Sequence, residues 1–145
     1  MSNVIVNVEI VVQRDDRFLM ILRSEEEEHG GGWLCFPGGK LDPGTAEMHA
    51  LELTARRELK EEVDLDVEAL AFRYVESHTF LIGDKTVLDI VLLTDSVQGV
   101  PKAIDPAEVA EVTWMTVDEI MTDPRVQPFT RESLRLALAA CNEPA

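Results

Sequence analysis

Cysteine and basic side chains are scarce in this sequence of 145 residues. The two cysteines, Cys35 and Cys141, are too few for a disulfide framework. Thirteen Lys and Arg residues stand against 28 Asp and Glu residues, which gives a net charge of −15. Bulk nucleic acid and anionic membranes are bound through clustered Lys and Arg, so this composition argues against both partners. An anionic small molecule would need local help from metal ions or from individual basic residues.

Long apolar runs and linkers are also missing. No segment approaches the ~20 apolar residues that span a membrane, and the start, Met1–Val4, lacks the basic region of a signal peptide. Apolar residues make up 46% of the chain and charged residues 28%, as in ordinary globular proteins. We therefore expect a single domain over residues 1–145 with one sizeable core, in a cytoplasmic enzyme.

Hydrophobic periodicity predicts a mixed α/β (α+β) order of elements. Period-two alternation and turn residues predict strands over residues 4–12, 18–22, 70–81, 86–94 and 109–115. Period-3.6 patterns predict helices over residues 46–63, 117–121 and 131–141. Thr116 and Glu119 have the spacing of a capping box at the start of the short helix.

The helix expected over residues 46–63 carries two stripes. Its apolar stripe should pack on the core and consists of Met48, Leu51, Ala55, Leu59 and Val63. Glu58, Glu61 and Glu62 fall within an arc of roughly 100° on another face. Three like charges at this spacing repel one another, unless water solvates them or a cation neutralises them. Hard cations such as Mg²⁺ and Mn²⁺ prefer carboxylate oxygen and water.

A solvated surface helix would show the same pattern, because Glu is a good helix former. On the helix alone this ordinary interpretation is favoured. The turn Pro37-Gly38-Gly39 precedes the helix, and glycines let backbone groups approach a ligand closely. Turn and helix together favour the metal site.

The segments Arg57–Glu62 and Trp33–Gly44 resemble the Nudix box and its lead-in loop, the signature of the Nudix (MutT-like) hydrolases. Gly39 and Arg57 lie 18 residues apart, four more than in the signature. Thr45 stands where the signature has its first Glu, and Asp64 replaces its closing Gly. An extra helical turn would absorb the insertion, and Glu47 could then stand in for the displaced Glu.

The resemblance implies the Nudix fold, a mixed β-sheet sandwiched between helices. It implies a metal-dependent hydrolase that cleaves a phosphoanhydride bond in a nucleoside diphosphate linked to another moiety, by attack of water. Mg²⁺ (or Mn²⁺) would be the cofactor, with Glu58, Glu61, Glu62 and the Gly39 carbonyl as ligands. Arg57 would orient one carboxylate through a bidentate pair, although a simple surface ion pair is the alternative.

Three residues near the glycines are candidates for substrate binding: Lys40, Trp33 and Arg23. Lys40 is placed to meet a phosphate or to face solvent, and the two interpretations are even. Trp33 would stack on a base or a sugar, or join the core. For Phe36 the core is preferred, and Cys35 is interpreted as a packing residue.

The general base is expected among the polar residues that border the site. Glu108 and Glu111 precede or begin the strand expected over 109–115, and Glu111 is the choice. A routine loop carboxylate is the equal alternative for Glu111. His78 is a further candidate, but a lone His near a strand end is more often structural.

The substrate is limited to a small-molecule nucleotide. The stretch Thr79–Gly83 lacks the Pro or Tyr that marks ADP-ribose-type and dinucleoside-polyphosphate-type subgroups, which leaves nucleoside triphosphates, including damaged ones, or another nucleotide-linked diphosphate. Two other functions stay open: a Nudix-fold binding or regulatory domain with little turnover, and an isopentenyl-diphosphate-isomerase-like enzyme, whose catalytic Cys context Cys35 does not match. Dimers are frequent in the family, so a homodimer is one option.

Overall fold

A computed structural model describes residues 3–27 and 30–141. Its strands are β1 (Val4–Arg14), β2 (Arg17–Arg23), β3 (Leu34–Cys35), β4 (Gly38–Lys40), β5 (Arg73–Ile82), β6 (Lys85–Thr94) and β7 (Val109–Thr116). Its helices are α1 (Ala50–Val63), the short 3₁₀ helix η1 (Ala69–Ala71), α2 (Val117–Thr122) and α3 (Pro128–Cys141). None of the described helices is long and apolar enough to cross a membrane.

The strands form one mixed sheet in the order β3-β2-β1-β6-β5, with β4 paired to β1 and β7 paired to β2. The central strand β1 runs parallel to β6, from Val4 opposite Thr86 to Val12 opposite Thr94. Its other edge is divided. In its middle, from Asn7 to Glu9, β1 pairs antiparallel with β4, and at its end it pairs antiparallel with β2. This division leaves the glycines of β4 beside the middle of the sheet.

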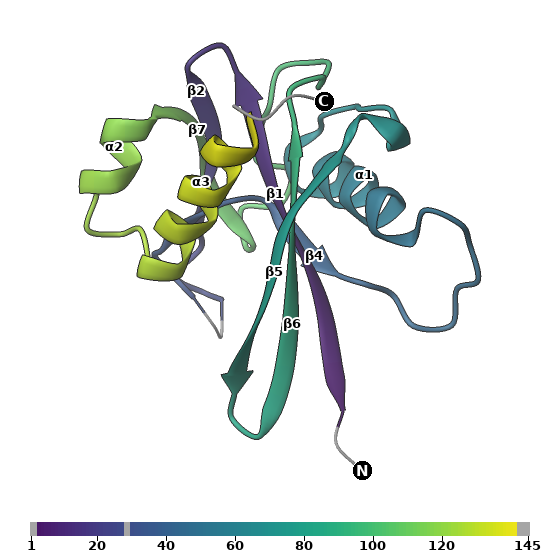
Figure 1. Ribbon diagram of the computed structural model, residues 1–145. Coiled ribbons are helices and arrows are strands. Elements are labelled where there is room, and N and C mark those ends of the chain that lie inside the picture. Colours follow the sequence, from purple (N-terminus) through teal and green to yellow (C-terminus); the bar gives the residue numbers. More distant parts are fainter. Residues whose placement is uncertain (1–2, 28–29, 142–145) are drawn as a thin grey trace.

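Helices cover both faces of the sheet, with α1 on one side and α2 and α3 on the other (Figure 1). The α1 side holds Val8, Ile10 and Val12 of β1, which pack in one cluster with Ala55 and Leu59 of the helix. The other side holds a second cluster that includes Val11, Ile120 and Leu134. The mixed sheet between helices confirms the expected fold class.

The sequence patterns predicted most elements, and the structure corrects several boundaries. The strands β1, β2, β6 and β7 lie where alternation predicted them. The capping box at Thr116 and Glu119 is present. Residue Leu70 does not belong to a strand, because it lies in η1 and is 73% exposed, and β5 begins only at Arg73. Helix α3 begins earlier than expected, at Pro128, because Pro fits the first helical position.

The start of α1 is the correction that matters for the site. The helix begins at Ala50 rather than at residue 46, since His49 has the left-handed φ of 56° and cannot continue a right-handed helix. Met48 is 81% exposed and does not join the apolar stripe. The four inserted residues therefore lengthen the loop before α1 and add no helical turn. Glu47 lies in this loop, so the helix does not present it beside Glu58.

Candidate active site

The acidic face of α1 is fixed by its apolar stripe. Ala55, Leu59 and Val63 are fully buried against the sheet, and the helix closes at Asp64 in a left-handed conformation with φ 58°. The sequence signal for this end was Asp64 itself, since Asp tolerates that conformation better than most residues. With both ends and one face fixed, Glu58 and Glu62 are turned toward β4.

Glu62 is held by the backbone of β4. The Gly38 amide donates a hydrogen bond of 2.9 Å to Oε1 of Glu62. A side chain at Gly38 would collide with the Val8 carbonyl oxygen, so the close approach of β4 to β1 requires glycine here. Burial raises the pKa of Glu62 to about 8; the Gly38 hydrogen bond opposes this rise and the charge of Glu58 adds to it.

Glu58 occupies the space that a side chain at Gly39 would fill. A Cβ built on Gly39 would overlap the carboxylate of Glu58. The Glu58 side chain is only 15% exposed. Burial raises its pKa, while the hydrogen bond and positive charge of Arg57 lower it. Gly38 and Gly39 thus bring two partly buried carboxylates against one short strand.

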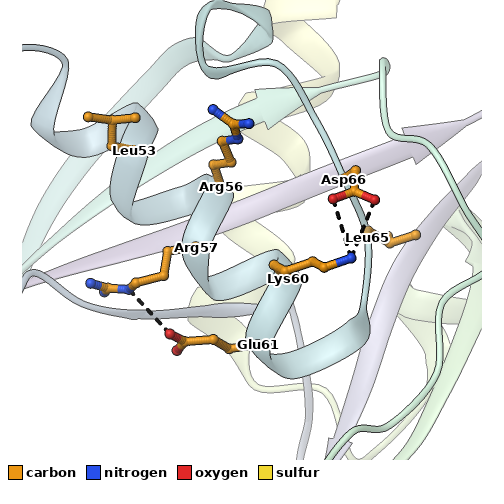
Figure 2. Close-up of a pocket in the computed structure, with 7 residues that line it drawn as sticks. All are labelled: Leu53, Arg56, Arg57, Lys60, Glu61, Leu65 and Asp66. Atoms are coloured by element: carbon orange, nitrogen blue, oxygen red, sulfur yellow. Dashed lines mark hydrogen bonds and ion pairs between the residues drawn. The ribbon is translucent and has the colours of Figure 1, made fainter.

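Arg57 ties the carboxylates to the segment after β4. Its Nη2 donates to Oε1 of Glu58 at 3.1 Å and to the Lys40 carbonyl at 3.2 Å. Its Nη1 forms an ion pair with Asp42. Its Nε lies 3.8 Å from Oε1 of Glu61, and Figure 2 shows the two side chains facing each other on the exposed side of α1. Arg57 thus makes one contact with Glu58 and one with Glu61, in place of the bidentate pair with one carboxylate that the resemblance implied.

Glu61 is more exposed than Glu58, although both contact the guanidinium of Arg57. Its side chain is 61% exposed and lines a hollow of about 380 Å³ on the outer side of α1. Figure 2 shows this hollow, where Lys60 reaches toward Asp66. Its lining residues are Leu53, Arg56, Arg57, Lys60, Glu61, Leu65 and Asp66. Neither Glu58 nor Glu62 lines it, so this hollow is not the predicted carboxylate site.

The carboxylate oxygens of Glu58 and Glu62 suit a hard divalent cation that is also coordinated by the phosphates of a substrate. Among the described residues no three acidic, His or Cys side chains gather closely enough to chelate an ion by themselves. Mg²⁺ does not need such a cage, because it is usually bound by one or two carboxylates, waters and substrate phosphates. Glu58 and Glu62 supply two carboxylates, and the charge of Glu58 raises the pKa of Glu62. A cation between them would relieve this repulsion.

The substrate-binding candidates lie at the rim of this arrangement. Arg23 ends β2 and forms an ion pair of 3.7 Å with Glu27, and its charge partly opposes the burial that raises the pKa of Glu62. Trp33 is 41% exposed, and its carbonyl accepts a hydrogen bond from the Arg23 amide. Lys40 is exposed, and its carbonyl accepts the Arg57 hydrogen bond. Phe36 is buried in the core, as expected.

The structure separates Glu111 from the other candidates. Glu111 pairs with Leu22, which packs in the cluster on the α2 and α3 side, so its side chain lies on the sheet face opposite α1. There its charge adds to the hydrogen bond from Arg125 to Asp123, which is the main reason that the pKa of Arg125 is raised. Glu108, in contrast, lies in the loop before β7, and its charge adds to the burial that raises the pKa of Glu62. The apolar alternation of Val112 and Trp114 is the sequence signal that could have placed Glu111 on the far face.

A buried acidic pair escaped the sequence analysis. Alternation along β1 pointed Glu9 away from the α1 core, but this face is covered by α3, and Glu9 is only 8% exposed. Its Oε2 accepts a hydrogen bond of 3.2 Å from the Ser133 hydroxyl. Burial, together with the neighbouring Asp89, raises the pKa of Glu9 well above its ordinary range. Asn7 donates a 2.7 Å hydrogen bond to Asp89.

Known proteins share this combination of mixed sheet, glycine strand and acidic helix. The family described as NUDIX domain matches residues 4–137. The chain belongs to the Nudix family. A structure described as a MutT NUDIX hydrolase from Burkholderia pseudomallei superposes on this Nudix chain with a TM-score of 0.79 at 22% identity, covering 93% of this chain and 98% of the other. The MutT protein from Methanosarcina mazei Go1 has a TM-score of 0.78 at 21% identity, covering 98% of each chain.

A curated relative of this Nudix chain is the CTP pyrophosphohydrolase of Escherichia coli (strain K12). The two sequences are 37% identical over 71 residues, which make up 49% of this chain and 47% of the relative. The match therefore spans about half of each protein. A bifunctional NMN adenylyltransferase/ADP ribose pyrophosphatase from Francisella tularensis, solved with AMP and a Mn ion, has a TM-score of 0.71 at 20% identity; the similarity covers 98% of this chain and 43% of that one.

Proposed function

We propose that this Nudix chain hydrolyses the phosphoanhydride bond of a nucleoside triphosphate or a related nucleotide, with Mg²⁺ or Mn²⁺ as cofactor. The proposal depends on one observation, the placement of two partly buried carboxylates, Glu58 and Glu62, against Gly39 and Gly38. Membership in the family supports it. The relative named CTP pyrophosphohydrolase supports a nucleotide substrate, with CTP as the first compound to test.

Each residue of the site has a proposed task. Glu58 and Glu62 would hold the cation, with Glu61 and the Gly39 carbonyl as further ligands. A divalent cation bound there would neutralise phosphoryl charge and lower the pKa of a coordinated water. Arg57 keeps Oε1 of Glu58 in place through its 3.1 Å hydrogen bond.

Substrate contacts and the proton acceptor come from the surrounding segments. Arg23 and Lys40 would offer positive charge to the phosphates, and Trp33 an aromatic face to the base or sugar. We propose Glu108 as the general base in place of Glu111. The Glu108 carbonyl accepts a hydrogen bond of 3.0 Å from the Ser24 amide, directly after Arg23, whereas Glu111 lies on the sheet face opposite α1. The described residues of both helical layers pack on the same sheet, which supports one catalytic domain over residues 1–145.

Cysteine chemistry of the isomerase kind has no support in this site. Burial raises the pKa of the Cys35 thiol to about 12, with the charge of Arg23 opposing the rise. A thiol with this pKa is almost entirely protonated near neutral pH, and the thiolate is the reactive form. The observation favours hydrolysis by water over a mechanism that uses Cys35.

The test is a phosphate- and pyrophosphate-release assay with CTP, other nucleoside triphosphates and nucleotide-linked diphosphates, each with Mg²⁺ or Mn²⁺. We expect E62Q to lower turnover by two or more orders of magnitude while the protein stays folded, and chelator to abolish it. Full activity of E62Q, or activity in excess chelator, would refute the site. Nucleotide binding without turnover across the panel would identify a regulatory domain instead.

The choice of base has its own pair of variants. E108Q should lower kcat by at least tenfold with little change in metal affinity. E111Q changes the same functional group on the other face of the sheet and should keep wild-type turnover. The reverse result would restore Glu111 as the base.

A further inference from the structure

The loop between β4 and α1, residues 41–49, is attached by few contacts. The Leu41 amide donates to the Val6 carbonyl at 2.9 Å, which fixes the start of the loop on β1. At its end the Leu53 amide donates to the His49 carbonyl at 2.9 Å. Between these points the loop and α1 enclose a hollow of about 230 Å³, lined by Leu41, Asp42, Thr45, Glu47, Leu53, Thr54 and Arg57. The hollow therefore lies between this part of the loop and α1.

Asp42 makes the side-chain contact from this loop to the acidic face. Its carboxylate forms an ion pair with Nη1 of Arg57. In the part of the chain that the structure describes, the ion pairs of Arg57 go to Asp42, Glu58 and Glu61, and Glu47 is not among its partners. Asp42 thus stands where the loop meets the charged network, although it matches no residue of the Nudix signature.

The planar guanidinium links these contacts to one another. Its nitrogens form a rigid fork, so a partner that fixes Nη1 also sets the directions of Nη2 and Nε. Nη2 holds Glu58 at 3.1 Å and Nε faces Glu61 at 3.8 Å. Without Asp42, Arg57 would keep the Lys40 carbonyl and the two glutamates as partners, but could rotate among them.

We propose that Asp42 is a positioning residue for the carboxylate site, acting through Arg57 on Glu58 and Glu61. The proposal rests on the proposed function, because the two glutamates are the proposed metal ligands. Residues that orient metal ligands change metal affinity by about 10- to 100-fold when they are replaced. Asp42 acts one contact further out, and its side chain is 62% exposed, so we expect an effect of about three- to tenfold.

The experiment compares D42N with D42E and with E47Q, a matched acid-to-amide change in the same loop. Mn²⁺ binding to the substrate-free protein is measured by electron paramagnetic resonance of the free ion. D42N should weaken Mn²⁺ binding by about three- to tenfold, D42E should recover most of the loss, and E47Q should bind like wild type. Thermal unfolding of D42N should match wild type, because the replaced ion pair is exposed.

Turnover and a double variant give independent readings. At subsaturating metal, D42N should lower kcat by a similar factor and leave the nucleotide KM unchanged. In the R57A background D42N should have no further effect, since Asp42 acts through Arg57. Wild-type Mn²⁺ affinity of D42N, an equal loss in E47Q, or an undiminished effect in R57A would each overturn the proposal.

The outcomes separate this inference from the proposed function. A wild-type protein that binds Mn²⁺ but hydrolyses no nucleotide would refute the function, while the binding series would still decide the role of Asp42. An active wild type with unaltered D42N would refute the positioning role alone. A wild type that binds no Mn²⁺ would overturn both.

Discussion

Replacing Glu62 with Gln should remove a pH-dependent loss of stability. The pKa of Glu62 lies at about 8 in the folded protein, mainly because of burial, against an ordinary value of 4.5. Between these two values the folded state keeps a proton that the unfolded state has released. By linkage, the stability that this proton provides is fully present below pH 4.5 and is lost as the pH rises through about 8.

The magnitude follows from the difference between the two pKa values. At ~1.36 kcal/mol per pKa unit it corresponds to roughly 5 kcal/mol, which is an upper value because Glu62 is partly exposed. We expect about half of it: between about pH 5 and pH 9 the free energy of unfolding should fall ~2–3 kcal/mol less in E62Q than in wild type. Gln keeps an oxygen for the Gly38 amide, so the variant should fold.

The assay is urea unfolding near pH 5, 7 and 9 in the presence of chelator. Glu9 contributes a decline of its own, because its pKa is also raised by burial, so the difference between the two proteins is the readout. E61Q is the matched control: Glu61 is 61% exposed, and its replacement should leave the wild-type profile in place. Parallel profiles for wild type and E62Q would refute the assignment of a raised pKa to Glu62.

Three further predictions concern the same region. G39A places a methyl group on the carboxylate of Glu58. Overpacking of this kind costs about 1–3 kcal/mol of stability, which urea unfolding measures. Turnover should fall at least tenfold in a nucleotide hydrolysis assay. Saturating Mg²⁺ should raise the melting temperature of wild type more at about pH 8.5 than at pH 6, because protons compete with the cation for Glu62, and an equal rise at both would contradict this. In a C141S background Cys35 should react with iodoacetamide near pH 8 at least a hundredfold more slowly when folded than in denaturant, since its folded pKa is about 12; mass spectrometry measures the rates.

The sequence was sufficient to predict those elements and residue positions for which a local pattern and the fold agree. Alternation along β1 and the apolar stripe of α1 gave the sheet and the buried face of the helix, and the spacing of Glu58 and Glu62 placed both on one face. Asp64 predicted its own left-handed helix end. These predictions depend on residues within a few positions of one another.

The errors arose where distant segments decide the outcome. Alternation places Glu111 on the face opposite Val112 and Trp114, but which of these faces borders α1 depends on the pairing of Glu111 with Leu22, which is distant in sequence. The sequence analysis made no prediction for Glu9, because the helix that covers it, α3, lies more than 100 residues away in sequence. The start of α1 was misplaced because the left-handed conformation of His49 has no signal in the residue type.

One edge of β1 pairs with two different strands, β4 and β2, and this explains how the chain tolerates four extra residues between Gly39 and Arg57. Gly38 and Gly39 are set by their pairing with Glu9 and Val8, while α1 is set by Leu59 and its neighbours in the core. The two halves of the site thus have separate anchors, and the segment that joins them can vary in length without displacing either. Closing a flexible loop of twice the length costs only about 0.6 kcal/mol more. Natural variants with shorter or longer joins should therefore keep the same relation between glycines and glutamates.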